Sequence, residues 1–73
     1  MITDKDFAKQ VIDVVFDCSG RLDELVLHAK DRCSEAEFVA FRRGIGDVMG
    51  EAWDELLLPI FAKHPDLKPK ELG

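Results

Sequence analysis

The stretch that decides the fold is Asp31–Phe38, which reads Asp-Arg-Cys-Ser-Glu-Ala-Glu-Phe. Ser34 is a favourable N-cap, because its hydroxyl can accept a hydrogen bond from a free backbone N–H of the following turn. Glu37, three residues later, can accept from the Ser34 backbone N–H and so complete a capping box. Cys33 before the cap and Phe38 after it are spaced for a hydrophobic staple. The stretch therefore predicts a turn followed at once by a helix.

The start of the chain carries the same signals. Thr3 is expected to be an N-cap, with Ile2 and Phe7 as its hydrophobic staple. Thr3 and Ser34 are 31 positions apart, and no strong break lies between them. We therefore expect a first long helix from about Asp4 to about Arg32. Similar capping chemistry is common, so the repeat does not indicate a duplicated gene.

Apolar residues in the first expected helix recur at steps of three and four, which is typical of an amphipathic helix. The main stripe comprises Phe7, Val11, Val14, Cys18, Leu22, Leu25 and Ala29. Further apolar residues lie beside this stripe and make the apolar face wider: Ala8, Ile12, Val15, Phe16, Val26 and Leu27. At about 100° per residue the apolar arc exceeds half the circumference. One partner helix cannot cover so wide an arc, so a third contact is expected.

The second expected helix begins after Ser34 and runs at least to Leu58. Its main stripe comprises Phe38, Phe41, Ile45, Val48, Met49, Ala52, Leu56 and Ile60, with a flank of Val39, Gly46, Trp53 and Leu57. Pro59 lacks a backbone donor and crowds the preceding turn, so a kink or stop is expected near Leu58. One more turn over 60–62 would then end at His64-Pro65. This gives a helical domain at 1–65 and an extended tail at 66–73, which Leu67 and Leu72 are placed to anchor.

Folding the chain at residues 32–34 gives an all-α, antiparallel helical hairpin. This pairing leaves part of the apolar surface in water, and an exposed apolar band of that length indicates an interface. Gly46 and Gly50, four apart, would allow another helix to approach closely. The interface residues expected from the sequence are Phe16, Leu27, Gly46, Gly50, Trp53 and Leu57. A two-fold homodimer of hairpins, forming a four-helix bundle, is the simplest arrangement that covers them.

Composition limits the classes of function. The chain has 73 residues and a net charge of −5, which argues for one domain and against a nucleic-acid binder. No apolar run of 18 residues and no signal peptide is visible, so no membrane span and a cytoplasmic location are expected. Cys18 and Cys33 are 15 positions apart, or roughly 22 Å along one helix, too far for a disulfide within the chain. They are expected to be reduced.

Candidate catalytic and metal-binding groups are sparse. His28 has Glu24 one turn before it, but no second pair of this kind occurs, and His64 is expected simply at a helix end. We expect no metal, no cofactor and no catalytic residue. The second helix carries an acidic ridge, composed of Asp47, Glu51, Asp54 and Glu55. Its Glu51-x-x-Asp54 spacing is similar to a pattern with which all-α nucleotide pyrophosphatases hold Mg²⁺, but those enzymes need a second acidic set facing the first.

Three hypotheses for function follow from these observations. The first is a non-enzymatic homodimer that serves as a protein-interaction module, with the acidic ridge or the tail facing a partner. The second is a subunit of a hetero-complex, such as an antitoxin, immunity protein or chaperone, whose apolar face binds another protein. The third is a small Mg²⁺-dependent enzyme that uses the acidic ridge.

Overall fold

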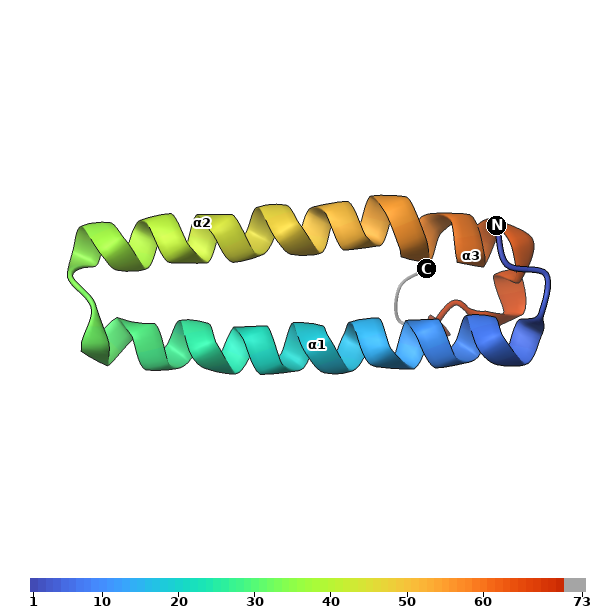
Figure 1. Ribbon diagram of the computed structural model, residues 1–73, viewed down its shortest axis with the longest axis horizontal. Coiled ribbons are helices and arrows are strands. Elements are labelled where there is room, and N and C mark those ends of the chain that lie inside the picture. Colours follow the sequence, from blue (N-terminus) through green and yellow to red (C-terminus); the bar gives the residue numbers. More distant parts are fainter. Residues whose placement is uncertain (71–73) are drawn as a thin grey trace.

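The computed structural model describes residues 1–70, and it is an antiparallel helical hairpin (Figure 1). No strand occurs within these residues. Its elements are α1 (Lys5–Arg32), α2 (Glu35–Ala52), a π-helical turn (Trp53–Leu57), α3 (Leu58–Lys63) and a 3₁₀ turn (Pro65–Leu67). The chain measures 45 × 20 × 16 Å, with the interhelical turn at one end and the N-terminus at the other. The all-α hairpin predicted from the sequence is confirmed.

The capping box between the two long helices forms as predicted. The Ser34 hydroxyl accepts a hydrogen bond from the Glu37 backbone N–H at 3.2 Å. The Glu37 carboxylate accepts one from the Ser34 backbone N–H at 2.9 Å. The Ser34 backbone N–H, and after it the Ser34 hydroxyl, lower the pKa of Glu37 because both stabilise its charged carboxylate. The box ends α1 and starts α2 within two residues, which sets the hairpin turn.

Replacing Ser34 with alanine is expected to lower the free energy of unfolding by about 1 kcal/mol, because an α2 donor loses its acceptor. Urea denaturation followed by circular dichroism measures this loss. Ala36→Ser, two positions along and exposed, serves as a control that changes one hydroxyl without touching the cap. An S34A protein that is as stable as the wild type would show that the box contributes nothing.

The start of α1 differs from the prediction by one residue. Asp4, and not Thr3, is the N-cap, and its carboxylate accepts a hydrogen bond from the Phe7 backbone N–H at 3.1 Å. This shift puts Ala8 at the fourth helical position, where it is fully buried, while Phe7 stays 51% exposed. Ile2 packs against the core cluster that contains Ala8. The predicted staple between Ile2 and Phe7 is therefore wrong.

Of the kink or stop expected near Leu58, the stop does not occur: the chain stays helical through Lys63 and the helix ends at His64, as expected for the last turn. A π-helical turn precedes Pro59, and in it the Leu58 backbone N–H donates to the carbonyl of Trp53, five residues earlier. Proline provides no N–H and its ring crowds the carbonyl four residues before it, here that of Glu55. A wider turn at this point relieves the crowding, so the helix passes through the proline.

The π turn changes which leucine is buried. A π turn holds one residue more than an α turn, so it moves the following side chains back around the helix by about one position. Leu57 is 1% exposed, whereas Leu56 is 37% exposed. A regular α-helix predicts the reverse, with Leu56 in the main stripe and Leu57 on the wet flank. The prediction that Leu57 is exposed is therefore wrong, and the added residue in the turn is the reason.

The core is concentrated at the end of the hairpin that holds the N-terminus. Its buried residues are Ala8, Ile12, Leu57, Ile60 and Phe61. Among the described residues Ala29, near the interhelical turn, is the other buried apolar side chain, and none of the residues of α2 is buried. The hairpin is thus well packed at one end and poorly packed along most of its length.

Two polar contacts hold the end of the described chain against its beginning. The His64 ring nitrogen Nε2 lies 2.8 Å from the Ile2 carbonyl oxygen, to which it donates. The Lys5 ammonium forms an ion pair with the Asp66 carboxylate. Leu67 packs against the core, as the sequence suggested, while Leu72 lies outside the described residues. The segment that follows residue 65 therefore begins as a packed 3₁₀ turn and not as an extended tail.

Acid is expected to loosen this contact between the two ends. The hydrogen bond from Lys5 holds the pKa of Asp66 below its ordinary value of 3.8. A lowered folded-state pKa means that Asp66 contributes stability above pH 3.8 and loses it as the pH falls through the lower folded value. The methyl signals of Leu67 in an NMR titration should move in that range. In Asp66→Asn they should not, and an unchanged titration in that variant would contradict the role of this ion pair.

Candidate interaction surface

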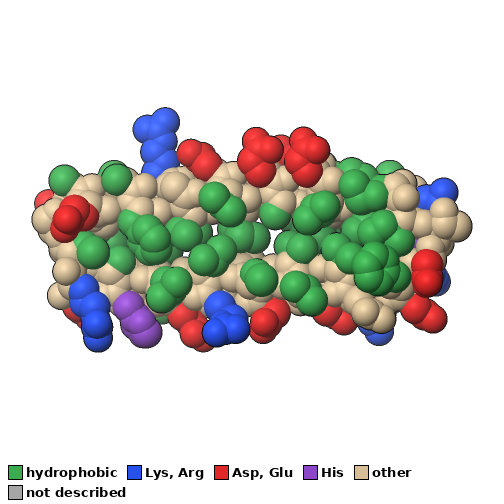
Figure 2. All heavy atoms as spheres, viewed as in Figure 1, with side chains coloured by type: hydrophobic (Ala, Val, Ile, Leu, Met, Phe, Trp, Pro, Cys, Tyr) green, Lys and Arg blue, Asp and Glu red, His purple; other side chains and the backbone are tan. Residues whose placement is uncertain are grey.

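One broad face of the hairpin exposes apolar side chains from both helices, and we call it the seam face. Its members are Phe7, Val14, Cys18 and Leu25 of α1, Phe41 and Val48 of α2, and Leu56 of the π turn. All seven are exposed, among them Val14 at 61% and Val48 at 58%. Figure 2 shows apolar side chains gathered along the line where the helices meet, from the turn to the opposite end. They make a band and not scattered surface residues.

Three shallow hollows lie along this face, and two of them are lined by residues from both arms of the hairpin. Near the N-terminal end Phe7 and Val14 line a hollow together with Leu56. Near the interhelical turn Leu25 lines another together with Phe41. A third, between them on α1, contains Cys18 and Leu25. Val48 lies seven residues, or about two turns, after Phe41 and thus on the same side of α2.

Packing between the helices is loose beneath the seam face. In the space-filling view gaps remain between α1 and α2 near the middle of the molecule (Figure 2). Ile45 and Met49 of α2 are only partly buried although they point toward α1 in the predicted stripe. Interiors that are fully formed pack like organic crystals. The seam is therefore an incomplete core.

Charges of opposite sign border the seam face on its two long edges. Arg21, His28 and Arg32 of α1 line the same hollows as the apolar residues. On the other edge the bordering residues are Glu37 and Glu51 of α2 and Glu55 of the π turn. Glu37 lies four positions before Phe41, and Glu51 lies three after Val48, so they are helical neighbours of the face. The charged side chains that directly border the face are therefore arginines on the α1 edge and glutamates on the α2 edge, and carboxylates of α1 lie further out on that helix (Figure 2).

Most interface residues expected from the sequence lie away from the seam face. Phe16 and Leu27 are exposed, at 38% and 67%, but on the opposite side of α1. Phe16 is nine residues, or two and a half turns, beyond Phe7. Trp53 packs edge-on against Phe61 at 5.9 Å between ring centroids, and Leu57 is buried. The last two belong to the core of a single chain.

The two predicted interface glycines have open surroundings. A Cβ added at Gly46 or Gly50 would meet nothing within 4 Å. Among residues 1–70 no other helix approaches closely at either position. Their role as contacts for a second chain stays a prediction.

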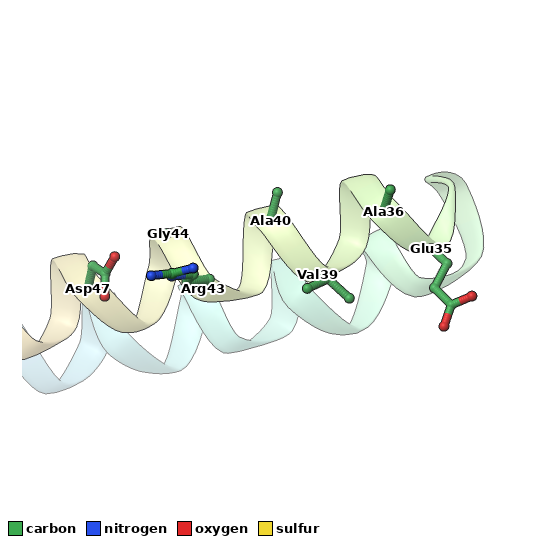
Figure 3. Close-up of a pocket in the computed structure, with 7 residues that line it drawn as sticks. All are labelled: Glu35, Ala36, Val39, Ala40, Arg43, Gly44 and Asp47. Carbon is green, nitrogen blue, oxygen red and sulfur yellow. The ribbon is translucent and has the colours of Figure 1, made fainter.

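A further hollow lies on the outer flank of α2, where it is lined by Glu35, Ala36, Val39, Ala40, Arg43, Gly44 and Asp47 (Figure 3). All seven residues come from one helix, so this is an open helix flank with no opposing wall. In this view Ala36 and Ala40 point to one side of α2, and Glu35 and Val39 point to the other. The flank includes Asp47 of the acidic ridge; the other three ridge residues, Glu51, Asp54 and Glu55, are also exposed.

The described residues offer little for chemistry. Within residues 1–70 no three His, Cys, Asp or Glu side chains are grouped to hold a metal ion. His28, Cys18 and Cys33 are exposed, and both cysteines are free thiols. In this part of the chain no helix has the length and hydropathy that crossing a bilayer requires.

The seam face carries a sequence signal that periodicity alone did not separate from the core. Phe7 and Val14, Cys18 and Leu25, and Phe41 and Val48 are each seven residues apart. Heptad spacing marks the contact line between long helices. In a chain whose apolar arc exceeds half a turn, the spacing does not say which line faces the same chain and which faces another.

The comparisons with protein-family models, curated proteins and solved structures found no match for this chain.

Proposed function

We propose that this chain is a non-enzymatic protein-interaction module that works as a homodimer, in which two hairpins join through their seam faces into a four-helix bundle. The observation that carries the proposal is the continuous apolar seam face, exposed along both helices of a hairpin whose middle is poorly packed. A second hairpin laid on this face would supply the two missing helices and complete the core.

The exposed area agrees with an unfilled interface of ordinary size. The chain exposes 5540 Å². A compact monomer of 8.2 kDa would expose about 4500 Å² by the usual scaling of surface with mass. The excess, about 1000 Å², is close to the roughly 800 Å² that each partner buries in a stable protein interface. One copy of the hairpin therefore has enough surplus surface for a dimer.

In such a dimer Asp47 and Asp54 of the acidic ridge would remain on the outside, while Glu51 and Glu55 border the seam face. Asp47 and Asp54 lie on the side of α2 away from the seam face and are exposed. A ridge of one charge on a rigid helix favours a partner with a basic surface. Two exposed free thiols fit a reducing, cytoplasmic setting.

Light scattering on a sizing column, at two protein concentrations, tests the proposal. We expect a folded species at twice the chain mass of 8.2 kDa. A well-folded monomer at both concentrations would overturn it. A monomer with helical circular dichroism but few dispersed NMR signals would also overturn it, and would favour the hetero-complex in which another protein covers the seam face.

A magnesium titration followed by NMR separates the module from an enzyme built on the acidic ridge. We expect no shifts at Asp47, Glu51, Asp54 and Glu55 at millimolar Mg²⁺, because carboxylates on an open helix face hold the ion weakly without a second set. Specific, saturable shifts at these residues would contradict the non-enzymatic proposal.

A further inference from the structure

We infer that the second copy lies on the seam face with its interhelical turn at the same end, so that α1 of each copy rests against α2 of the other. This inference rests on the proposed homodimer and specifies its arrangement. The occupant of the seam face is thus another copy of this chain in one orientation.

Two-fold symmetry offers two simple ways to stack the hairpins face to face. If the two-fold axis runs along the helices, both turns lie at one end and α1 of one copy covers α2 of the other. If the axis runs across the helices, the turns lie at opposite ends, α1 covers α1, and α2 covers α2. Apolar contacts form in both cases, so the charged edges decide between them.

The same-end arrangement brings edges of opposite charge together. The hollow shared by Leu25, Cys33 and Phe41 shows that the end of α1 is level with the start of α2. Arg32 would therefore lie level with Glu37 of the second copy. Along the hairpin Arg21 lies between Phe41 and Leu56, in the same stretch as Glu51 and within reach of a long side chain, although not level with it. Each basic edge faces an acidic one, and the symmetry forms each contact twice.

The opposite-end arrangement brings edges of like charge together. The acidic α2 edge would face the same edge of the second copy, and Glu51, near the middle of the hairpin, would approach its own counterpart. Neither arginine of α2 is placed to compensate. Arg42 lies over the Phe38 ring, 5.5 Å from its centroid, and Arg43 lines the outer flank of α2. Contacts between like charges across an interface therefore disfavour the opposite-end arrangement.

Carboxylates on α1 do not reverse this pattern. Asp13, Asp17 and Glu24 are further from the seam, beyond Arg21 and His28 on the outer side of the helix. They face solvent in both arrangements and hence contribute little to the choice between them.

Distances between nitroxide spin labels test the arrangement, because Cys33 is exposed at the turn. With Cys18→Ala, the label on Cys33 reports one site per chain. We expect a label–label distance under about 30 Å, since neighbouring helix axes in a bundle lie about 10 Å apart. Turns at opposite ends would give a distance near the 45 Å length of the hairpin.

A label in the middle of α1 reports dimer formation in either arrangement. Gly20→Cys, with both native cysteines replaced, places it where an added Cβ meets no neighbour and away from the seam face. Short distances from both labels support the inference. A short distance at position 20 with a long one at Cys33 overturns the arrangement and leaves the homodimer standing. No measurable distance at either position overturns both.

Reversing charges gives a second readout. Arg21→Glu with Arg32→Glu should weaken self-association about tenfold at low salt, because acidic edges would then face each other. Adding Glu51→Arg should restore the part of the loss that comes from position 21. In the opposite-end arrangement like charges would still face like charges. Self-association that is neither weakened by the first two substitutions nor restored by the added one would therefore overturn the inference.

Discussion

Leu57→Ala is expected to lower the free energy of unfolding by about 3 kcal/mol, a large part of the roughly 5 kcal/mol typical of a domain this small. Leu57 is 1% exposed and packs in the cluster of buried residues at the N-terminal end. The loss has two parts: the favourable free energy of moving the removed atoms out of water, and the cost of the cavity that remains. Urea denaturation followed by circular dichroism measures it.

Leu58→Ala is the matched control, because it removes the same atoms one position later from a side chain that is 44% exposed. It should cost under about 1 kcal/mol, as exposed substitutions usually do. The comparison tests the π turn directly, since a regular α-helix would bury Leu56 in place of Leu57. Equal losses for Leu57→Ala and Leu58→Ala would contradict the register that the structure shows.

Val48→Asp is expected to weaken dimer formation about a thousandfold while leaving the single hairpin helical. The substitution puts a carboxylate in the centre of the seam face, and symmetry repeats it in the second copy. Two buried, unpaired charges cost on the order of 4 kcal/mol, and every 1.4 kcal/mol is a factor of ten. Sedimentation equilibrium over a range of concentrations measures the change.

Leu27→Asp is its control. Leu27 is 67% exposed, more than Val48 at 58%, but it lies on the side of α1 away from the seam face. It should leave the dissociation constant within about threefold of the wild type, as a surface substitution outside the contact area does. A larger loss from Leu27→Asp than from Val48→Asp would show that the two copies meet through the other face, where Phe16 also lies.

The capping box explains why the hairpin was predictable from the sequence. Ser34 and Glu37 act only on residues within one turn, so their effect is fixed by chemistry that a short stretch contains. The first helix was placed correctly to within a residue for the same reason. Its cap moved from Thr3 to Asp4, because both residues offer a side-chain oxygen and the choice depends on how Ile2 packs on the core.

The π turn explains what the sequence did not show. Pro59 predicts that the helix is distorted, because its ring crowds the carbonyl four residues earlier. A kink, a stop or a wider turn would each relieve this crowding. The outcome depends on whether Leu57 and Phe61 find a core, which they do against Ala8 and Ile12, fifty residues away along the chain. The expected exposure of Leu57 was wrong because helical periodicity was extended through this turn unchanged.

The position of the core reverses the usual order in which a helical hairpin opens. Chain ends generally fray first, and the loop between packed helices opens later. Here the end with Ile60 and Phe61 is the packed one, while α2 next to the interhelical turn has no fully buried side chain. Amide hydrogens near Phe38 should thus exchange with solvent through local opening long before those near Ile12. We therefore expect the hairpin to open first at the interhelical turn and last at the end where its N-terminus packs against α3.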